Sequence, residues 1–313
     1  MSWDTSSMPD QSGRTVVVTG ANSGLGYEGS NAFVAKGADV VMACRSLDRG
    51  REAAAAISDA VTADEASLTV MELDLGDLDS IASFADSFSA RFDDLHVLCN
   101  NAGVMAVPRG ETADGFERQF GVNHLGHFAL TGHLLDDLRG TSGESRVVTQ
   151  SSGVHEQGSI RFDDLQFEQS YDEWAAYAQS KLANLLFAYE LDRRLDAAGA
   201  DVVSVGCHPG YAATNLQKRG PQESGSTLRL FAMRAANAVL GQSAARGALP
   251  MLYAATAAGI EGGAYVAPGG FMNMRGAPQV QQSSAASYDE DDAERLWAIS
   301  ADLTGVEYDL SEA

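Results

Sequence analysis

Tyr177 and Lys181 stand four residues apart in a long Ala/Leu-rich segment, and together they could exchange a proton with a substrate. Residues at this spacing share one face of an α-helix. A lysine cation beside a phenol favours the phenolate and brings its pKa toward working pH, as a general acid or base requires. The same spacing occurs by chance in many helices, so the pair by itself is a weak indication.

A glycine-rich segment near the N-terminus, residues 19–26, is suited to binding a pyrophosphate. Glycines allow a tight turn and let the backbone approach a phosphate at the positive end of the following helix. The spacing Gly-x-x-x-Gly-x-Gly lies between a strand-like run and a helical pattern, which favours a nucleotide site over an ordinary turn. The candidate cofactor contacts here are Gly20, Asn22, Ser23, Gly24, Leu25 and Gly26.

Arg45 and Ser46 follow the second strand-like run, where dinucleotide sites distinguish their cofactors. An acidic residue there would bind the adenosine ribose 2′-hydroxyl of NAD, whereas an arginine suits the 2′-phosphate of NADP. Because no acid stands at this strand end, the sequence predicts NADP, with NAD left open as a second cofactor.

These residues are placed by a regular alternation of short apolar runs and helical patterns. Such alternation implies right-handed βαβ units, and hence an α/β fold with one Rossmann-type, doubly wound parallel sheet and helices on both faces. The expected strands, about seven, are 15–19, 39–44, 68–73, 96–100, 146–150, 202–207 and 263–266. The expected helices are 25–36, 48–61, 80–92, 114–138, 172–198 and 244–258.

No Pro/Ser-rich linker divides the 313 residues, so we expect one domain. A polar tail covers residues 1–12, and the nucleotide-binding domain covers residues 13–270. Within the domain, residues 211–242 depart from the strand–helix rhythm and are expected to form a substrate loop. Residues 271–313 are expected to form a C-terminal extension with a short helix near 291–303.

The composition disfavours several classes of function. Acids outnumber bases by 43 to 21, and a net charge of −22 repels nucleic-acid phosphates and anionic lipid. No apolar run approaches the ~18–20 residues that span a bilayer, and the N-terminus lacks a signal-peptide pattern. Three cysteines far apart, without a CxxC pair, argue against disulfides and cysteine zinc sites. We therefore expect a cytoplasmic protein with no membrane anchor, no nucleic-acid partner and no metal.

Taken together, the motifs have the order and approximate spacing of the short-chain dehydrogenase/reductase family, which the chain resembles over about residues 13–268. The motifs are residues 19–26, 100–103 (NNAG), Ser152, the Tyr177/Lys181 pair and residues 208–210 (HPG). Three further features resemble the retinol dehydrogenase branch, which also holds protochlorophyllide-reductase-like members. These are the run GVNHLGHF at 121–128, the run SKLAN at 180–184, and the long gap between Ser152 and Tyr177.

The resemblance implies a role for each matching residue. Tyr177 would be the general acid/base, Lys181 would bind the nicotinamide ribose and lower the tyrosine pKa, and Ser152 would hold the substrate oxygen. Asn123 would position a water that relays protons. The other implied cofactor contacts are Asp74 with Leu75 at the adenine, Asn101 and Ala102 with Gly103 on the adenosine-ribose side, and Pro209, Gly210 and Thr214 at the nicotinamide. Gln150 departs from the small or aliphatic residue that relatives carry before the serines.

We expect an NADP-preferring oxidoreductase that interconverts an alcohol and a carbonyl by hydride transfer, with an apolar aldehyde, ketone or retinol-like molecule as substrate. No metal is needed, because hydrogen bonds from serine and tyrosine stabilise the developing alkoxide. Two alternatives stay open: a C=C double-bond reductase of the protochlorophyllide-reductase-like kind, and a non-catalytic NADP-binding sensor. The intact catalytic set argues against the sensor. The exact substrate, the reaction direction, and the choice among monomer, homodimer and homotetramer are also open.

The acidic surplus favours a halophilic cytoplasm. Carboxylates hold water and cations, and their mutual repulsion is screened in concentrated salt. Only Lys36, Lys181 and Lys218 are lysines among the 21 basic residues. A GC-rich genome that prefers arginine codons would explain scarce lysine, but it would not explain a net charge of −22.

We predict that thermal stability rises from low to molar potassium chloride. The Debye length falls from ~30 Å at 0.01 M to ~3 Å at 1 M salt, so the carboxylates stop repelling one another. Thermal melts across the salt series measure this directly. A flat or falling melting temperature would contradict the halophilic interpretation and leave codon preference as the explanation.

Overall fold

One sheet of eight strands forms the centre of the molecule, in the order β3-β2-β1-β4-β5-β6-β7-β8. The computed structural model describes residues 3–61, 66–211, 242–270 and 273–310. The strands are β1 (Thr15–Thr19), β2 (Asp39–Cys44), β3 (Leu68–Glu72), β4 (Val97–Asn100), β5 (Ser145–Gln150), β6 (Val202–Cys207), β7 (Tyr265–Pro268) and β8 (Pro278–Gln281). All neighbouring pairs are parallel except β7 and β8. The predicted doubly wound α/β fold is confirmed.

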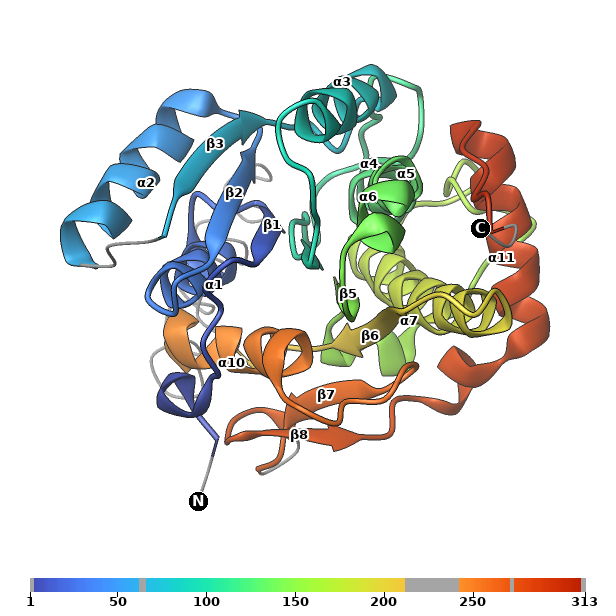
Figure 1. The fold of residues 1–313 in the computed structure, drawn as a ribbon. Helices are drawn as coiled ribbons and strands as arrows, with labels where there is room; N and C mark the ends of the chain where they lie inside the picture. Colours follow the sequence, from blue (N-terminus) through green and yellow to red (C-terminus); the bar gives the residue numbers. More distant parts are fainter. Residues whose placement is uncertain (1–2, 62–65, 212–241, 271–272, 311–313) are drawn as a thin grey trace, which may run out of the picture.

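Helices cover both faces of this sheet (Figure 1). The α-helices are α1 (Gly24–Val34), α2 (Leu47–Ala60), α3 (Leu78–Ser89), α4 (Arg118–Phe120), α5 (Gly126–His133), α6 (Leu135–Gly140), α7 (Glu173–Ala197), α10 (Ala244–Thr256) and α11 (Glu290–Thr304). Shorter elements are η1 (Thr5–Ser7), the π-helical turn η2 (Gly121–Leu125), η3 (Gly153–Gln157) and η5 (Ala285–Tyr288). Because parallel strands buried on both faces need apolar residues throughout, the strands read as near-continuous apolar runs.

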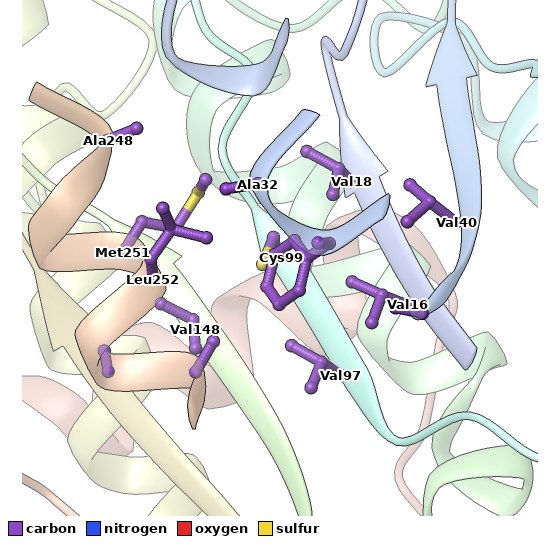
Figure 2. Packing of buried hydrophobic residues seen from close by; sticks show 14 of the residues in the cluster. Val16, Val18, Ala32, Val40, Val97, Cys99, Val148, Ala248, Met251 and Leu252 are labelled. Carbon is purple, nitrogen blue, oxygen red and sulfur yellow. The ribbon is translucent and has the colours of Figure 1, made fainter. Parts of the chain in front are cut away.

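Alternate residues of each strand enter different cores, as the two-residue period of a strand requires. Val16 and Val18 of β1 belong to the core beneath α1, α2 and α10, whereas Val17 belongs to the core beneath α3, α5 and α7. Figure 2 shows Val148 beside Leu252 of α10, whereas Val16 and Val18 lie on the far side of Ala32 of α1. The β-branched strand residues therefore fix two helix layers at once.

Two expectations about the elements were wrong. Residues 278–281 pair antiparallel with β7 as an eighth strand, although their polar sequence read as a tail outside the sheet. This strand is short and at the sheet edge, where polar residues and an initial proline are tolerated. The single helix expected at 114–138 is instead α4, η2, α5 and α6. Gly115, at φ +86°, cannot continue a helix, and the Glu117 carboxylate caps α4 by accepting from two backbone N–H groups.

The C-terminal helix α11 lies on the outer side of α7 and near α5 (Figure 1). Trp297 stacks on Phe187 of α7 at 5.8 Å between ring centroids and meets Phe128 of α5 edge-on at 5.1 Å. Tyr308, just after the helix, donates to the Phe128 carbonyl at 2.6 Å. The apolar outer surface of these two helices is thus buried within the same chain.

We predict that Trp297→Ala lowers the free energy of unfolding by about 3–5 kcal/mol, the usual cost of truncating a buried tryptophan. Trp174→Ala is the matched control, because the Trp174 side chain is 48% exposed against 8% for Trp297. The control should change stability by no more than about 0.5 kcal/mol. Urea unfolding at one fixed salt concentration measures both, and equal losses would show that α11 is not anchored through Trp297.

Candidate active site

The glycine-rich turn after β1 is packed so closely that side chains are excluded from it. Gly20 has φ +66°, and a Cβ there would lie 3.0 Å from the Cβ of Ala102. A Cβ on Gly26 would lie 2.6 Å from the Gly20 carbonyl oxygen and 2.7 Å from Asn101 Nδ2. The turn therefore needs glycine at both positions, as its spacing suggested.

The N-terminus of α1 leaves its backbone donors available to a ligand. Ser23, at the N-cap, makes no side-chain capping hydrogen bond, and the first turn contains no acid. By contrast α2, α3 and α7 are capped by side chains, those of Ser46, Asp77 and Asp172. Unpaired N–H groups and the positive end of a helix dipole form a site for a phosphate group.

A cavity of about 390 Å³ extends from this turn along the carboxyl ends of the strands. It lies where the strand order reverses between β1 and β4, the usual ligand position in an open α/β sheet. Twelve of the predicted cofactor contacts line it: Gly20, Asn22, Ser23, Gly24, Leu25, Arg45, Ser46, Asp74, Leu75, Asn101, Ala102 and Gly103. The glycine cradle and the uncapped helix fit the phosphate groups of a nucleotide, whereas Tyr177, Lys181, Pro209 and Gly210 do not line this cavity.

Arg49 also lines the cavity, although the sequence reasoning missed it. It stands in the first turn of α2, and its backbone N–H is the group that the Ser46 hydroxyl caps, at 3.5 Å. The spacing of four residues from Arg45 would have been the available signal. Two arginines thus reach the same side of the cavity, and no acid stands at the end of β2.

A second group of polar side chains is buried beyond the cavity, around Tyr177. The Ser152 side chain lies close enough to the Tyr177 phenol to influence its pKa, and Tyr177 is only 4% exposed. Burial raises the pKa of Tyr177 to about 12, and the Ser152 side chain opposes this effect. The phenol is therefore neutral at neutral pH and able to donate a proton.

Lys181 lies on the same side of α7 as Tyr177, with Nζ 5.8 Å from the centre of the phenol ring. Its Nζ donates to the Gln150 carbonyl at 3.1 Å, and burial lowers the pKa of Lys181 to about 8. In this arrangement burial, and not the lysine charge, is the largest influence on the phenol. The pKa-lowering role implied for Lys181 stays a prediction.

Asn123 stands in the π-helical turn η2, where its side chain holds the loop after β4. Its Oδ1 accepts from the Val104 N–H at 2.8 Å, and its Nδ2 donates to the Val104 carbonyl and to Ser180 Oγ, both at 2.9 Å. A Cβ on Gly103 would lie 2.9 Å from Asn123 Oδ1 and 3.5 Å from Lys181 Nζ. The cavity residue Gly103 therefore directly adjoins the Tyr177 group.

Two histidines support the loops at the ends of β5 and β6, in agreement with the backbone role expected for His208 in the loop before Pro209. His155 Nδ1 contacts the Ser152 carbonyl at 2.6 Å, and His155 Nε2 accepts from the Ser284 N–H at 3.2 Å. His208 Nδ1 accepts from the Gly210 N–H at 3.1 Å, which fixes the turn predicted to hold the nicotinamide. The contact between His155 and Ser284 joins segments far apart in the sequence, so no local pattern could reveal it.

The remaining predicted contacts are placed as follows. Pro209 follows β6 at the same sheet edge as Ser152, and its carbonyl accepts from Gln242 Nε2 at 2.6 Å. Thr214 lies outside the described residues. Cys44, Cys99 and Cys207 are free and buried. Within the described ranges, no three His, Cys, Asp or Glu side chains converge as metal ligands, and no helix is long and apolar enough to cross a bilayer.

Comparisons with known proteins agree with this geometry. The family model for short chain dehydrogenases matches residues 14–224. Retinol dehydrogenase 12 of Homo sapiens is 40% identical over 302 residues, covering 95% of this chain and 88% of its own. Polyprenol dehydrogenase of Mus musculus is 40% identical over 303 residues, covering 95% and 86%. Some solved structures of the same fold hold NADP.

A solved structure shows the same likeness across the whole chain. An uncharacterized protein from Mycobacterium paratuberculosis superposes with a TM-score of 0.80 and 40% identity, covering 98% of this chain and 99% of its own. The glycine turn with its uncapped helix is the nucleotide cradle of such a fold, and the family uses a nicotinamide cofactor. The chain belongs to the short-chain dehydrogenase/reductase family of oxidoreductases, in the branch that includes the retinol dehydrogenases.

Proposed function

We propose that this protein is an NADP-preferring oxidoreductase that interconverts an apolar alcohol and its aldehyde or ketone, with Tyr177 as the general acid/base. The observation that carries this proposal is that Ser152 and the buried Tyr177 phenol lie together, next to the cavity lined by the glycine turn. Two hydroxyls that lie together can both contact a single substrate oxygen.

The chain's own residues supply the proton and hold the oxygen. A bound nicotinamide cofactor supplies or accepts the hydride. In the reduction direction Tyr177 donates its proton to the carbonyl oxygen, while the Ser152 hydroxyl stabilises the negative charge that develops there. Because burial keeps the Tyr177 pKa near 12, the tyrosine holds its proton throughout the neutral range. Lys181 adjoins the same ring and is proposed to hold the cofactor ribose.

The substrate class is proposed from the relatives. Retinol and polyprenol, named in the relatives, are both long apolar isoprenoid alcohols with one hydroxyl at the end. An apolar alcohol of this kind offers one polar atom to the Ser152–Tyr177 pair and an apolar body to the rest of the site. The predicted substrate loop falls largely on residues 212–241, outside the described residues.

The preference for NADP is proposed from Arg45 and Arg49, which line the same cavity. A guanidinium can bind a phosphate through two parallel N–H donors.

A panel of carbonyl compounds tested with NADPH distinguishes this function from the two alternatives, a C=C double-bond reductase and a non-catalytic NADP-binding sensor. Reduction of activated C=C bonds alone would favour the double-bond reductase, and binding without any turnover would favour the sensor.

We predict that Tyr177→Phe lowers kcat for carbonyl reduction by about two to four decades, the usual contribution of general acid catalysis. Cofactor affinity should change little, because the aromatic ring remains. Tyr189→Phe is the matched control, since Tyr189 is also buried on α7 with a hydrogen-bonded hydroxyl, here to Ser283 Oγ at 2.7 Å. Steady-state rates measure both variants, and a Tyr177→Phe enzyme with near-normal kcat would disprove the assignment.

We predict that NADPH is preferred over NADH at least ~10-fold in kcat/KM, because a hydrogen bond to a charged group is worth about 1.5–3 kcal/mol. Arg45→Asp should erase or reverse the preference, while kcat at saturating cofactor stays largely intact. Arg51→Asp is the control, because it changes the charge by the same amount at a residue that does not line the cavity. Arg51 stands on α2 and pairs with Asp48 at 3.6 Å.

Both cofactor measurements need one fixed ionic strength, because salt weakens the phosphate contact. Equal use of NADH by the wild type would refute the assignment of Arg45. So would an Arg45→Asp enzyme that loses both cofactors alike, or an Arg51→Asp enzyme that shifts the preference as far.

A further inference from the structure

We propose that His127 is a positioning residue that couples the cofactor-binding turn at Thr19 to the π-helical turn at Asn123. The inference rests on the proposed function, because it concerns the same site. His127 stands on α5, is 1% exposed, and contacts both turns through its two ring nitrogens. One ring nitrogen bonds to the Thr19 hydroxyl, and the other bonds to the backbone carbonyl of Asn123.

The partners of the ring determine which nitrogen holds the proton. His127 Nδ1 lies 3.0 Å from the Asn123 carbonyl oxygen, which can only accept, so Nδ1 carries the proton. His127 Nε2 lies 3.0 Å from Thr19 Oγ1 and, in the neutral ring, must accept from that hydroxyl. Burial lowers the pKa of His127 to about 4, so the ring is neutral at working pH.

On the cofactor side, His127 Nε2 accepts the single hydrogen bond that the Thr19 hydroxyl can donate. Thr19 Oγ1 already accepts from the backbone N–H groups of Asn101 and Ala102, both at 2.9 Å. A hydroxyl has two acceptor positions and one donor, so its donor decides how it is oriented. The alternative acceptor, the Cys99 carbonyl at 3.2 Å, is farther away and already accepts from the Asn101 N–H at 2.9 Å.

Asn101 and Ala102, whose N–H groups donate to Thr19, both line the cofactor cavity. Gly20, the residue after Thr19, begins the glycine turn and lines the same cavity. Asn101 Nδ2 also donates to the Thr19 carbonyl at 2.8 Å. A rotated Thr19 side chain would release the Ala102 N–H and leave the Asn101 N–H with the Cys99 carbonyl as its other acceptor. His127 therefore holds the position of the turn without touching the cofactor.

On the catalytic side, the same ring fixes the backbone of Asn123, whose side chain is committed elsewhere. That side chain holds Val104 and the Ser180 hydroxyl, and Ser180 precedes Lys181. A shift of the π-helical turn would move these contacts together. Misplacement of reacting groups by about 1 Å can cost on the order of 100-fold in rate.

His124 provides a matched control from the neighbouring part of the same segment. It is 2% exposed, its pKa is also lowered by burial, and its Nε2 contacts Ser300 Oγ of α11 at 2.8 Å. Although His124 stands in the π-helical turn, its ring bonds to the C-terminal helix and makes no hydrogen bond to Thr19 or to the Asn123 backbone. A general loss of packing should affect His124 and His127 variants alike, whereas the coupling belongs to His127 alone.

The test compares three substitutions of His127 with His124→Leu. His127→Leu removes both hydrogen bonds, His127→Asn keeps an amide N–H near the Nδ1 position, and His127→Gln keeps an amide near the Nε2 position. The Kd for NADPH is measured by fluorescence titration and kcat by steady-state reduction, both on protein shown to be folded by circular dichroism.

We expect His127→Leu to raise the Kd by about 3- to 10-fold, the value of one net hydrogen bond, and to lower kcat at least about 10-fold. His127→Gln should restore the Kd more than kcat, and His127→Asn should restore kcat more than the Kd. The combined effect of Thr19→Val and His127→Leu on the Kd should be smaller than the product of their separate fold-changes, because both remove the bond between Thr19 and His127.

Wild-type Kd and kcat in all three His127 variants would overturn the inference, as would equal losses in His124→Leu. Additive effects of Thr19→Val and His127→Leu would overturn it as well. If His127→Leu does not fold, the Asn and Gln variants with Thr19→Val decide the question through the same split between Kd and kcat. A wild type that binds NADPH but reduces no carbonyl would refute only the proposed function, since the Kd comparison still tests His127.

Discussion

The hydroxyl of Thr19 is the interaction on which the arrangement of the site depends. It lies at the end of β1, beside β4, where the strand order reverses and the sheet opens. By accepting from the N–H groups of Asn101 and Ala102, it joins the ends of these two strands at 2.9 Å. The glycine turn begins at the next residue, so its position is defined by strands that are more than 75 residues apart in sequence.

Burial dominates the electrostatics of the group around Tyr177, and it acts in opposite directions on acid and base. It raises the pKa of the phenol to about 12 and lowers that of Lys181 to about 8. Both changes disfavour the charged form, as removal from water requires. The site therefore holds a neutral donor beside a lysine whose pKa lies nearer to neutral pH than that of an exposed lysine.

The C-terminal extension is part of the body of the protein and not an appendage. Through Trp297, Tyr308 and the contact of Ser300 with His124, α11 buries the outer surface of α5 and α7. Contact with a second chain through this surface would require α11 to be displaced.

The sequence alone determined the fold class, the ends of most elements and the residues at the strand ends. These rest on local physics: the apolar period of buried strands, the conformational freedom of Gly20, and the helical spacing of Tyr177 and Lys181. What only the tertiary structure decided was set by partners distant in the chain. The π-helical turn depends on Asn123 reaching Val104 and Ser180, and β8 depends on an open edge beside β7. The roles of His127 and His155 as links likewise follow from contacts that exist only once the sheet brings its strand ends together.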